Sequence, residues 1–414
     1  MTSNGPMAGN EGTRFLPYGR QAIDQSDIDA VVKVLRGDYL TTGPTVAAFE
    51  ERLAAKLGAA HAVSCSSGTA ALHLACAALG LGPGQAAIVP SLTFLASANA
   101  VRMVGAEVVF ADVDPDSGLM RPQDLEAAFA RARAVGLDVR AVLPVHLAGP
   151  AADMIGLAAI AEREGAAIIE DACHALGTEY PRSGDRIGLV GDCALSRMTV
   201  LSFHPVKTVV AGEGGAITTN DPDLARRLVL LRAHGMVRDP ARFENHDLAF
   251  DSQGQPNPWY YEMPEVGWNY RLSDIHAALA THQLARLDEF AAARRALVAH
   301  YDSRLEGHPH IRPIARPANA ARPVWHLYAV LIDFAGLGLE RGPVMRRLAE
   351  RNIGSQVHYI PVHRQPYYAA RYPGVELPGA ESYYRQTLSL PLFVGLAPAE
   401  ADRVVRELTA LVDG

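Results

Sequence analysis

Lysine is the rarest charged residue in this chain of 414 residues. Only Lys33, Lys56 and Lys207 occur among the 38 basic residues, and arginine supplies all the others. A bias of this size reflects overall composition and has no functional meaning in itself. It does mean that a lysine in an unusual sequence setting calls for a specific explanation.

Cysteine and long apolar runs are also scarce. The four cysteines are scattered and form no Cys-x-x-Cys pair, which excludes a disulfide framework and favours a reducing, cytoplasmic location. No apolar run approaches the roughly 20 residues that a membrane span requires. Residues 1–13 lack the basic and apolar regions of a signal peptide, and we expect residues 1–14 to form a flexible tail.

An excess of basic charge is absent as well. The 38 basic and 45 acidic residues give a net charge of −7, and no Lys/Arg-dense block interrupts this balance. This balance argues against nucleic acid as a partner. With 49% hydrophobic residues, the chain can instead bury a sizeable core in two or more domains.

Residues 60–220 alternate between short β-rich runs and alanine-rich helical segments such as 70–79 and 154–164. This alternation predicts an α/β layer in which helices cover both faces of a mostly parallel sheet. We expect it to belong to a large domain over residues 15–300. The predicted strands are 61–64, 87–89, 108–110, 141–144, 167–170, 199–201 and 215–218.

The pattern changes after Gly267. Residues 272–301 predict one long helix or a helical pair, and the Pro-rich residues 308–323 predict an irregular connection. Together with the later elements they predict a smaller α+β domain over residues 301–414. Those later elements are strands at 327–333 and 354–359 and helices at 342–351 and 400–412.

The three lysines have different settings. Lys33 and Lys56 lie in amphipathic helix patterns, where a lysine on the polar face is solvated. Lys207 instead follows an apolar, strand-like run that begins at Val200 and precedes Gly212-Glu213-Gly214-Gly215. This setting favours a desolvated, nucleophilic amine.

A turn between a predicted strand and a helix, Ser64-Cys65-Ser66-Ser67-Gly68-Thr69, has the features of a phosphate site. Such a turn directs backbone N–H groups and a helix dipole at one point. Gly68 permits close approach, and Thr69 adds a hydroxyl. From these residues alone, an ordinary N-capped helix is an equal alternative.

Asp171 follows the apolar run 167–169 and Glu170. A carboxylate at the carboxyl end of a buried parallel strand requires a partner, and ligands bind at this edge of such sheets. A cationic ring nitrogen would be a suitable partner. An aspartate that caps the next helix is the alternative.

These three elements together match the requirements of pyridoxal phosphate (PLP). The cofactor needs an anchor for its phosphate, an anion beside its pyridinium nitrogen and an amine that binds its aldehyde as a Schiff base. The sequence therefore predicts PLP as the cofactor. No metal-ligand spacing accompanies it, so we expect no metal site.

From Pro17 to its C-terminus the chain resembles the DegT/DnrJ/EryC family of PLP-dependent nucleotide-sugar aminotransferases. The resemblance implies an aspartate-aminotransferase-like fold (PLP fold type I) with a mixed, mostly parallel central sheet and a smaller α+β C-terminal domain. It also implies an active aminotransferase. The motifs that carry it include Ser66-Ser67-Gly68-Thr69-Ala70-Ala71-Leu72, Pro90-Ser91-Leu92-Thr93-Phe94, Glu170-Asp171-Ala172-Cys173-His174, Ser202-Phe203-His204-Pro205-Val206-Lys207, Gly267-Trp268-Asn269-Tyr270-Arg271 and Val357-His358-Tyr359-Ile360-Pro361.

Within the family, the chain is most similar to the transaminases of pseudaminic acid biosynthesis. Softer motifs carry this similarity, and they include Pro17-Tyr18-Gly19-Arg20-Gln21, Leu40-Thr41-Thr42-Gly43-Pro44 and Trp259-Tyr260-Tyr261-Glu262. It implies a UDP-linked 4-keto-6-deoxy-N-acetyl-β-L-altrosamine type substrate with L-glutamate as amino donor. GDP- and dTDP-sugar aminotransferases share parts of these motifs and remain an alternative.

The resemblance also implies roles for single residues. Lys207 would bind the cofactor and carry the proton, and Asp171 would pair with the ring nitrogen. Phe94 would lie against the ring face, and His174 would lie near its hydroxyl edge. The phosphate would be held by Gly68, Thr69 and Ser202, and the nucleotide sugar by Tyr18, Thr41, His358 and Tyr359.

Asn269 resembles the family's asparagine that reaches the cofactor phosphate of the neighbouring subunit. This similarity implies a homodimer with shared active sites. The polar insertion 238–257 departs from the family pattern, and a flap near the sugar site is one interpretation of it. Cys173 is a second departure, interpreted as a harmless packing change.

Several alternatives remain open from the sequence. A core role is an equal alternative for Phe94. His358 and His363 could be surface histidines, and Tyr260 and Tyr261 could pack in a dimer interface. A non-catalytic PLP-binding regulator is the competing function, but it would lose the lysine, the aspartate or the phosphate motif. Sugar dehydratases of the family carry histidine at the lysine position, so Lys207 favours transamination.

Overall fold

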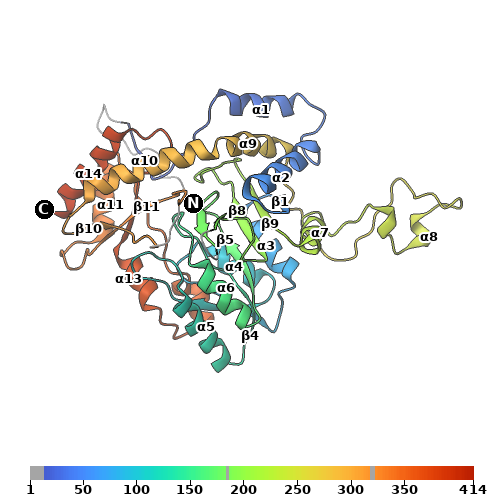
Figure 1. Cartoon of the computed structure of the whole chain (residues 1–414), viewed down its shortest axis with the longest axis horizontal. Helices are drawn as coiled ribbons and strands as arrows, with labels where there is room; N and C mark the ends of the chain where they lie inside the picture. Colours follow the sequence, from blue (N-terminus) through green and yellow to red (C-terminus); the bar gives the residue numbers. More distant parts are fainter. Residues whose placement is uncertain (1–13, 183–185, 318–321) are drawn as a thin grey trace.

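A computed structural model of the protein describes residues 14–182, 186–317 and 322–414, and the predicted tail up to residue 13 lies outside the described residues. The centre of the fold is a seven-stranded sheet in the order β1-β9-β8-β5-β4-β2-β3 (Figure 1). Only β9 runs antiparallel to its neighbours, so the prediction of a mixed, mostly parallel sheet is confirmed. The strands are β1 (His61–Cys65), β2 (Gln85–Pro90), β3 (Glu107–Ala111), β4 (Asp138–Val142), β5 (Ala167–Asp171), β8 (Met198–Ser202) and β9 (Gly215–Thr219).

Both faces of this sheet are covered by helices because successive strand residues point to opposite sides. Ile88 and Ile168 pack in one apolar cluster, and their neighbours Val89 and Ile169 pack in another. Helices α3, α4 and α7 contribute to the cluster of Val89, and α2, α5 and α6 to that of Ile88. With α1, their bounds are α1 (Gln25–Leu35), α2 (Pro44–Leu57), α3 (Gly68–Leu79), α4 (Leu95–Met103), α5 (Pro122–Ala134), α6 (Met154–Arg163) and α7 (Pro222–Leu231).

The segment predicted as one long helix or a pair is a pair, α9 (Asp274–Ala285) and α10 (Leu287–Leu305). In Figure 1 this pair runs along one side of the molecule, from α1 to α14 (Pro398–Val412). Because α10 extends across residue 300, the domain border predicted there falls within a helix. The division into two domains stays a prediction.

A second, three-stranded antiparallel sheet lies in the C-terminal part, in the order β10-β11-β12. Part of the Pro-rich stretch forms β10, so the prediction of a wholly irregular connection is wrong there, and residues 318–321 lie outside the described residues. The elements are β10 (Ile311–Pro313), β11 (Tyr328–Ile332), α11 (Arg341–Glu350), η2 (Val362–Arg364), α12 (Pro366–Arg371), α13 (Pro378–Gln386) and β12 (Thr387–Leu390).

The strand predicted at 354–359 is wrong. This segment is irregular and has one bridge to the small sheet, between Gln356 and Ser389. It is held over the large sheet by the η2 turn, where Val362 N–H donates to Ser91 O at 2.8 Å. The segment therefore lies as a loop between the two sheets.

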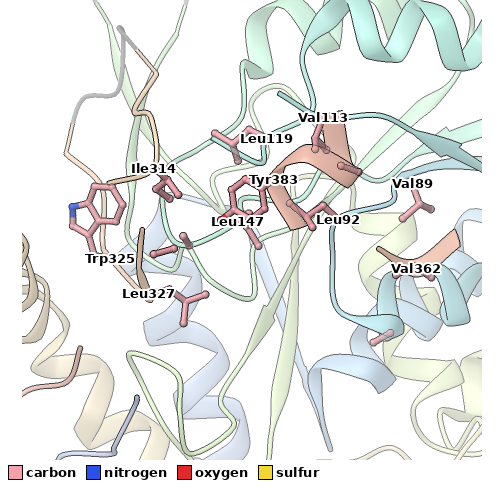
Figure 2. Close-up of a cluster of buried hydrophobic side chains, with 14 of the residues drawn as sticks. Val89, Leu92, Val113, Leu119, Leu147, Ile314, Trp325, Leu327, Val362 and Tyr383 are labelled. Atoms are coloured by element: carbon pink, nitrogen blue, oxygen red, sulfur yellow. The ribbon is translucent and has the colours of Figure 1, made fainter. Parts of the chain in front are cut away.

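A continuous apolar cluster joins the small sheet to the carboxyl ends of the large one (Figure 2). Tyr383 of α13 lies among Leu92, Leu119 and Leu147 from the loops of the large sheet, and Trp325 and Leu327 extend the cluster towards β11. These side chains are all nearly inaccessible. The packing fixes the position of the 354–361 loop relative to the large sheet.

An arm projects sideways from the body in Figure 1 and contains η1 (Pro240–Arg242) and α8 (His246–Ala249). It has a small apolar cluster of its own around Val237, Phe243 and Ala249. A two-stranded sheet of β6 (Glu179–Pro181) and β7 (Ile187–Leu189) completes the elements. Among the described residues, we find no helix whose length and apolar character would let it cross a membrane.

Candidate active site

A cavity of about 400 Å³ lies at the carboxyl ends of β5 and β8, beneath the 354–361 loop. Its size is within the range of small-molecule sites. It brings together most of the predicted site residues, from segments that are far apart in the chain. Those that line it are Tyr18, Gly68, Thr69, Phe94, Asp171, His174, Ser202, Lys207, His358 and Tyr359.

Gly68 and Thr69 form the first residues of α3, after the N-cap Ser67. The N–H groups of a first helical turn have no carbonyl partner within the helix, so they are available to an anion. Ser202 lies beside them, and a Cβ on Gly68 would stand 2.9 Å from its Cβ. A larger residue at position 68 would therefore close the space next to the helix end.

Asp171 is the last residue of β5 and is buried. Its Oδ2 accepts a 2.6 Å hydrogen bond from the Ser97 hydroxyl of α4, and its Oδ1 accepts the Cys173 N–H at 3.2 Å. Because Ser97 uses its one proton on Asp171, the 2.8 Å contact between Ser97 and Thr93 is donated by Thr93. Three side chains thus form one hydrogen-bonded row that holds the carboxylate.

Lys207 lies in the loop after β8, and its backbone N–H donates to His204 O at 2.8 Å. The side chain is partly buried in the cavity wall. Burial lowers the pKa of its amine, although Cys173 and Asp171 act in the opposite direction. A lowered pKa makes the neutral, nucleophilic form of the amine more accessible.

Both ring nitrogens of His174 have partners within the chain. Nδ1 accepts the Ala148 N–H at 3.2 Å, and Nε2 lies 3.1 Å from the Tyr359 hydroxyl. Burial lowers the pKa of His174 well below its usual range, and Lys207 and His358 add to the effect. The His326 ring lies against it, with ring centroids 4.3 Å apart.

The wall contributed by the 354–361 loop and the N-terminal segment is aromatic. The rings of Tyr18 and His358 are 5.3 Å apart, and those of Phe94 and Tyr359 are 6.0 Å apart. His358 Nδ1 is 2.8 Å from the Ser389 hydroxyl, and burial lowers the pKa of His358 to about 3. Phe94 is 39% exposed, which contradicts the alternative of a core residue and leaves its ring facing the cavity.

Two predicted site residues lie elsewhere. In the part of the chain that the structure describes, Thr41 and Asn269 are exposed and line no part of this cavity. Thr41 forms a bridge with Ser273, and Asn269 forms one with Ala233. The arm also lies outside: of residues 238–257, all described, none lines the cavity of its own chain, so a flap over that cavity is not observed.

The sequence predictions missed Ser97 and His326. His326 lines the cavity, is 4% exposed, and its Nδ1 has no hydrogen-bond partner among the described residues. A signal existed for both: each is a polar residue in an otherwise apolar run, Ala96-Ser97-Ala98 and Val324-Trp325-His326-Leu327. Such residues must find a partner when they are buried.

The residues present fit PLP. The free N–H groups of α3 and the small Gly68 form a phosphate cradle, the fixed Asp171 carboxylate suits a pyridinium nitrogen, and Lys207 opens into the same cavity. Phe94 supplies an apolar surface for a flat ring. This combination of donors matches the chemistry of the cofactor group by group.

Comparison with known proteins agrees with this geometry. A profile of the DegT/DnrJ/EryC1/StrS aminotransferase family matches residues 21–409. Helicobacter pylori PseC, described as an aminotransferase involved in the biosynthesis of pseudaminic acid, is 26% identical with a TM-score of 0.85, over 97% of this chain and 100% of that one.

Two further solved structures are similar. The PLP form of Spr1654 from Streptococcus pneumoniae, described as a sugar aminotransferase, is 27% identical with a TM-score of 0.84, over 96% of this chain and 99% of that one. DesI, analysed in the presence of its TDP-sugar product, is 30% identical with a TM-score of 0.80, over 98% of this chain and 94% of that one.

Proposed function

Because the chain belongs to the DegT/DnrJ/EryC1/StrS aminotransferase family and is a PLP-dependent aminotransferase, we propose that it transfers an amino group to a nucleotide-linked 4-keto-6-deoxy sugar. The preferred substrate is of the UDP-4-keto-6-deoxy-N-acetyl-β-L-altrosamine type, with L-glutamate as donor, as in pseudaminic acid biosynthesis. The observation that carries the proposal is the meeting of Lys207, Asp171 and the α3 cradle in one cavity. The similarity to PseC over the whole chain supports the choice of sugar.

When bound, PLP supplies an electron-poor ring that takes up the electron pair of a broken C–H bond. The Lys207 Nζ would accept the proton of the C–H bond that breaks in each half-reaction, and in the half-reaction that forms the amino sugar it would deliver that proton to C4 of the sugar. Burial favours this role, because it lowers the pKa of the amine and makes its neutral, proton-accepting form more accessible than that of an exposed lysine. Asp171 keeps the ring nitrogen protonated by presenting its fixed carboxylate.

The remaining residues orient the bound molecules. Gly68, Thr69 and Ser202 would hold the phosphate through N–H and hydroxyl donors, and Phe94 would supply an apolar surface for the ring. The apolar side chains that line the cavity exclude water from the reacting atoms. The sugar would bind against Tyr18, His358 and Tyr359, which line the same cavity.

The residues that line the cavity support a homodimer with shared sites. The cavity is lined by Lys207 but, in the described part of the chain, by no arginine, although a nucleotide sugar brings a diphosphate. Thr41 and Asn269 are exposed and unused in their own chain's cavity. Both side chains are uncharged, so we assign them to the active site of a second copy of this chain as hydrogen-bonding residues and not as its missing cation.

A dTDP-linked keto sugar is the second candidate. DesI, which was analysed with its TDP-sugar product, is 30% identical to this chain, a higher identity than that of PseC. The two candidate substrates share the same chemistry at C4 and differ in the nucleotide base and in the sugar substituent at C2.

The cytoplasmic location expected from the cysteines stays a prediction.

A substrate panel tests the proposal. The purified holoenzyme is assayed with UDP-, GDP- and dTDP-linked 4-keto-6-deoxy sugars, each with L-glutamate or L-glutamine, and the amino sugar is identified by mass spectrometry. We expect the highest kcat/KM for the UDP-linked N-acetylhexosamine with glutamate. A preference for a dTDP sugar would favour the second candidate, and turnover of none would contradict the proposed function.

A further inference from the structure

His174 is held in one protonation form by a backbone group. The Ala148 N–H donates to its Nδ1, so this nitrogen carries the lone pair. A neutral imidazole has one N–H, which must then be on Nε2. The ring is buried among Ala148, His326 and Tyr359, and burial favours the neutral form.

The direction of the next hydrogen bond follows from this. Nε2–H of His174 donates to the Tyr359 hydroxyl oxygen, 3.1 Å away. The hydroxyl proton of Tyr359 is therefore not used on His174, and among the described residues the hydroxyl has no other hydrogen-bond partner. Tyr359 lines the cavity together with Lys207, so its proton is available to a bound molecule.

Ala148 has an unusual backbone conformation that supports this arrangement. Its φ is +64°, a region that residues with a side chain rarely adopt, and it is fully buried. Its carbonyl accepts the N–H groups of His326 at 2.8 Å and Leu327 at 3.2 Å, which hold the turn against the small domain. Strained backbone of this kind persists where the surrounding structure imposes it and is concentrated at functional sites.

We propose that Tyr359 is a catalytic residue that donates a hydrogen bond to an oxygen of the molecule bound beside Lys207, and that His174 and Ala148 position it. The inference rests on the proposed function, since it requires PLP and a keto sugar in this cavity. It changes the role of His174, whose two nitrogens are already occupied and which meets the bound molecule with its ring only. The acceptor is a phenolic or hydroxyl oxygen, from either the cofactor or the sugar.

The test compares Tyr359→Phe, His174→Phe and the double variant, each as the purified holoenzyme. The first arm measures the dissociation constant of PLP and the visible absorption spectrum of bound PLP against pH, without substrate. The second arm measures binding of UDP-N-acetylglucosamine as an unreactive nucleotide-sugar probe. Tyr301→Phe is the control, because its hydroxyl is buried outside the cavity and donates to Pro391 O at 2.9 Å.

We expect Tyr359→Phe to weaken binding in one arm by roughly 3- to 10-fold, the effect of one lost hydrogen bond. His174→Phe is expected to give a similar loss, and the double variant no further loss, because His174 acts through Tyr359. His174→Gln can accept from Ala148 and donate to Tyr359, so it should restore most of the binding and the spectrum. A change in the first arm identifies the cofactor oxygen as the acceptor, and a change only in the second arm identifies the sugar.

Two results would overturn the inference. One is a Tyr359→Phe holoenzyme that equals the wild type in both arms. The other is a double variant that loses much more than either single variant, which would mean that His174 contacts the bound molecule itself. Failure of the proposed function is seen separately, as an absence of turnover with every keto sugar, and does not depend on these binding measurements.

Discussion

The hydroxyl of Ser97 on α4 donates a 2.6 Å hydrogen bond to Oδ2 of Asp171 on β5, and these residues are 74 positions apart in the chain. With the Cys173 N–H on Oδ1, it leaves the carboxylate a single orientation. Both donors hold the carboxylate oxygens in place at the carboxyl end of β5, where a pyridinium nitrogen could meet them.

Ser97→Ala removes one of these donors and should lower kcat by roughly 10- to 100-fold, since a hydrogen bond to a charged group contributes about 1.5–3 kcal/mol. Cofactor binding should fall less, because the phosphate cradle is untouched. The measurement is the rate of the half-reaction with the amino donor, together with the spectrum of bound PLP. Combined with Asp171→Asn, the Ser97→Ala effect should vanish; an unchanged, additive effect would assign Ser97 to packing only.

A matched control is Ser117→Ala. The Ser117 hydroxyl accepts the Leu119 N–H at 3.3 Å and is buried outside the cavity. We expect this variant to lose some stability and to keep the rate of the half-reaction.

Lys207 is expected to be the only lysine that binds the cofactor. Borohydride reduction of the holoenzyme should attach PLP to the peptide that contains Lys207, identified by peptide mass mapping. Lys33 and Lys56 lie on helix surfaces and serve as internal controls. Lys207→Ala should reduce turnover by about three orders of magnitude or more while the fold persists. A label on Lys33 or Lys56 would refute the assignment.

The apoenzyme should become more stable when Lys207 is replaced by methionine. Burial lowers the pKa of this amine below its value of 10.5 in the unfolded chain. Between the two pKa values the unfolded state binds a proton that the folded state does not, so stability rises with pH across this window. At pH 7 to 8 the Lys207→Met apoenzyme should therefore melt higher than the wild type, and the difference should shrink as the pH rises towards 10.5. Thermal unfolding at several pH values measures the difference in melting temperature between the two apoenzymes. A difference that stays constant with pH would contradict the prediction.

Mixing two inactive variants tests the proposed homodimer. If Asn269 completes the site of the partner subunit, a mixed dimer of Lys207→Ala and Asn269→Ala protomers has one site with both lesions and one with neither. Activity should rise on mixing towards half of the wild-type value per dimer, provided that Asn269→Ala is itself severe. Subunit exchange is verified by native mass spectrometry. A mixture no more active than the mean of its parents would place Asn269 in the site of its own chain.

Much of the large sheet could be predicted from the sequence. Each of its strands is a short apolar run bounded by turns, and the predicted runs overlap all seven observed strands. The 354–359 segment misled the same reasoning: its sequence predicts a strand, but in the described part of the chain it makes a single bridge to the small sheet, between Gln356 and Ser389. A sequence pattern indicates which side chains are buried, but it does not show whether the backbone of the segment pairs with a neighbouring strand.

The sequence by itself determined those functional residues that can be identified from their immediate neighbours in the chain. Lys207, Asp171 and the Gly68-Thr69 turn each stand out against their immediate neighbours, because a charge or a glycine beside an apolar strand requires a local reason. Only the tertiary structure decided which residues support them. The contact of Tyr359 with His174 joins residues 185 positions apart, and that of Ser97 with Asp171 joins two separate elements. Such contacts depend on how the 354–361 loop and the helices pack against the large sheet, and packing geometry leaves no periodic signal in the chain.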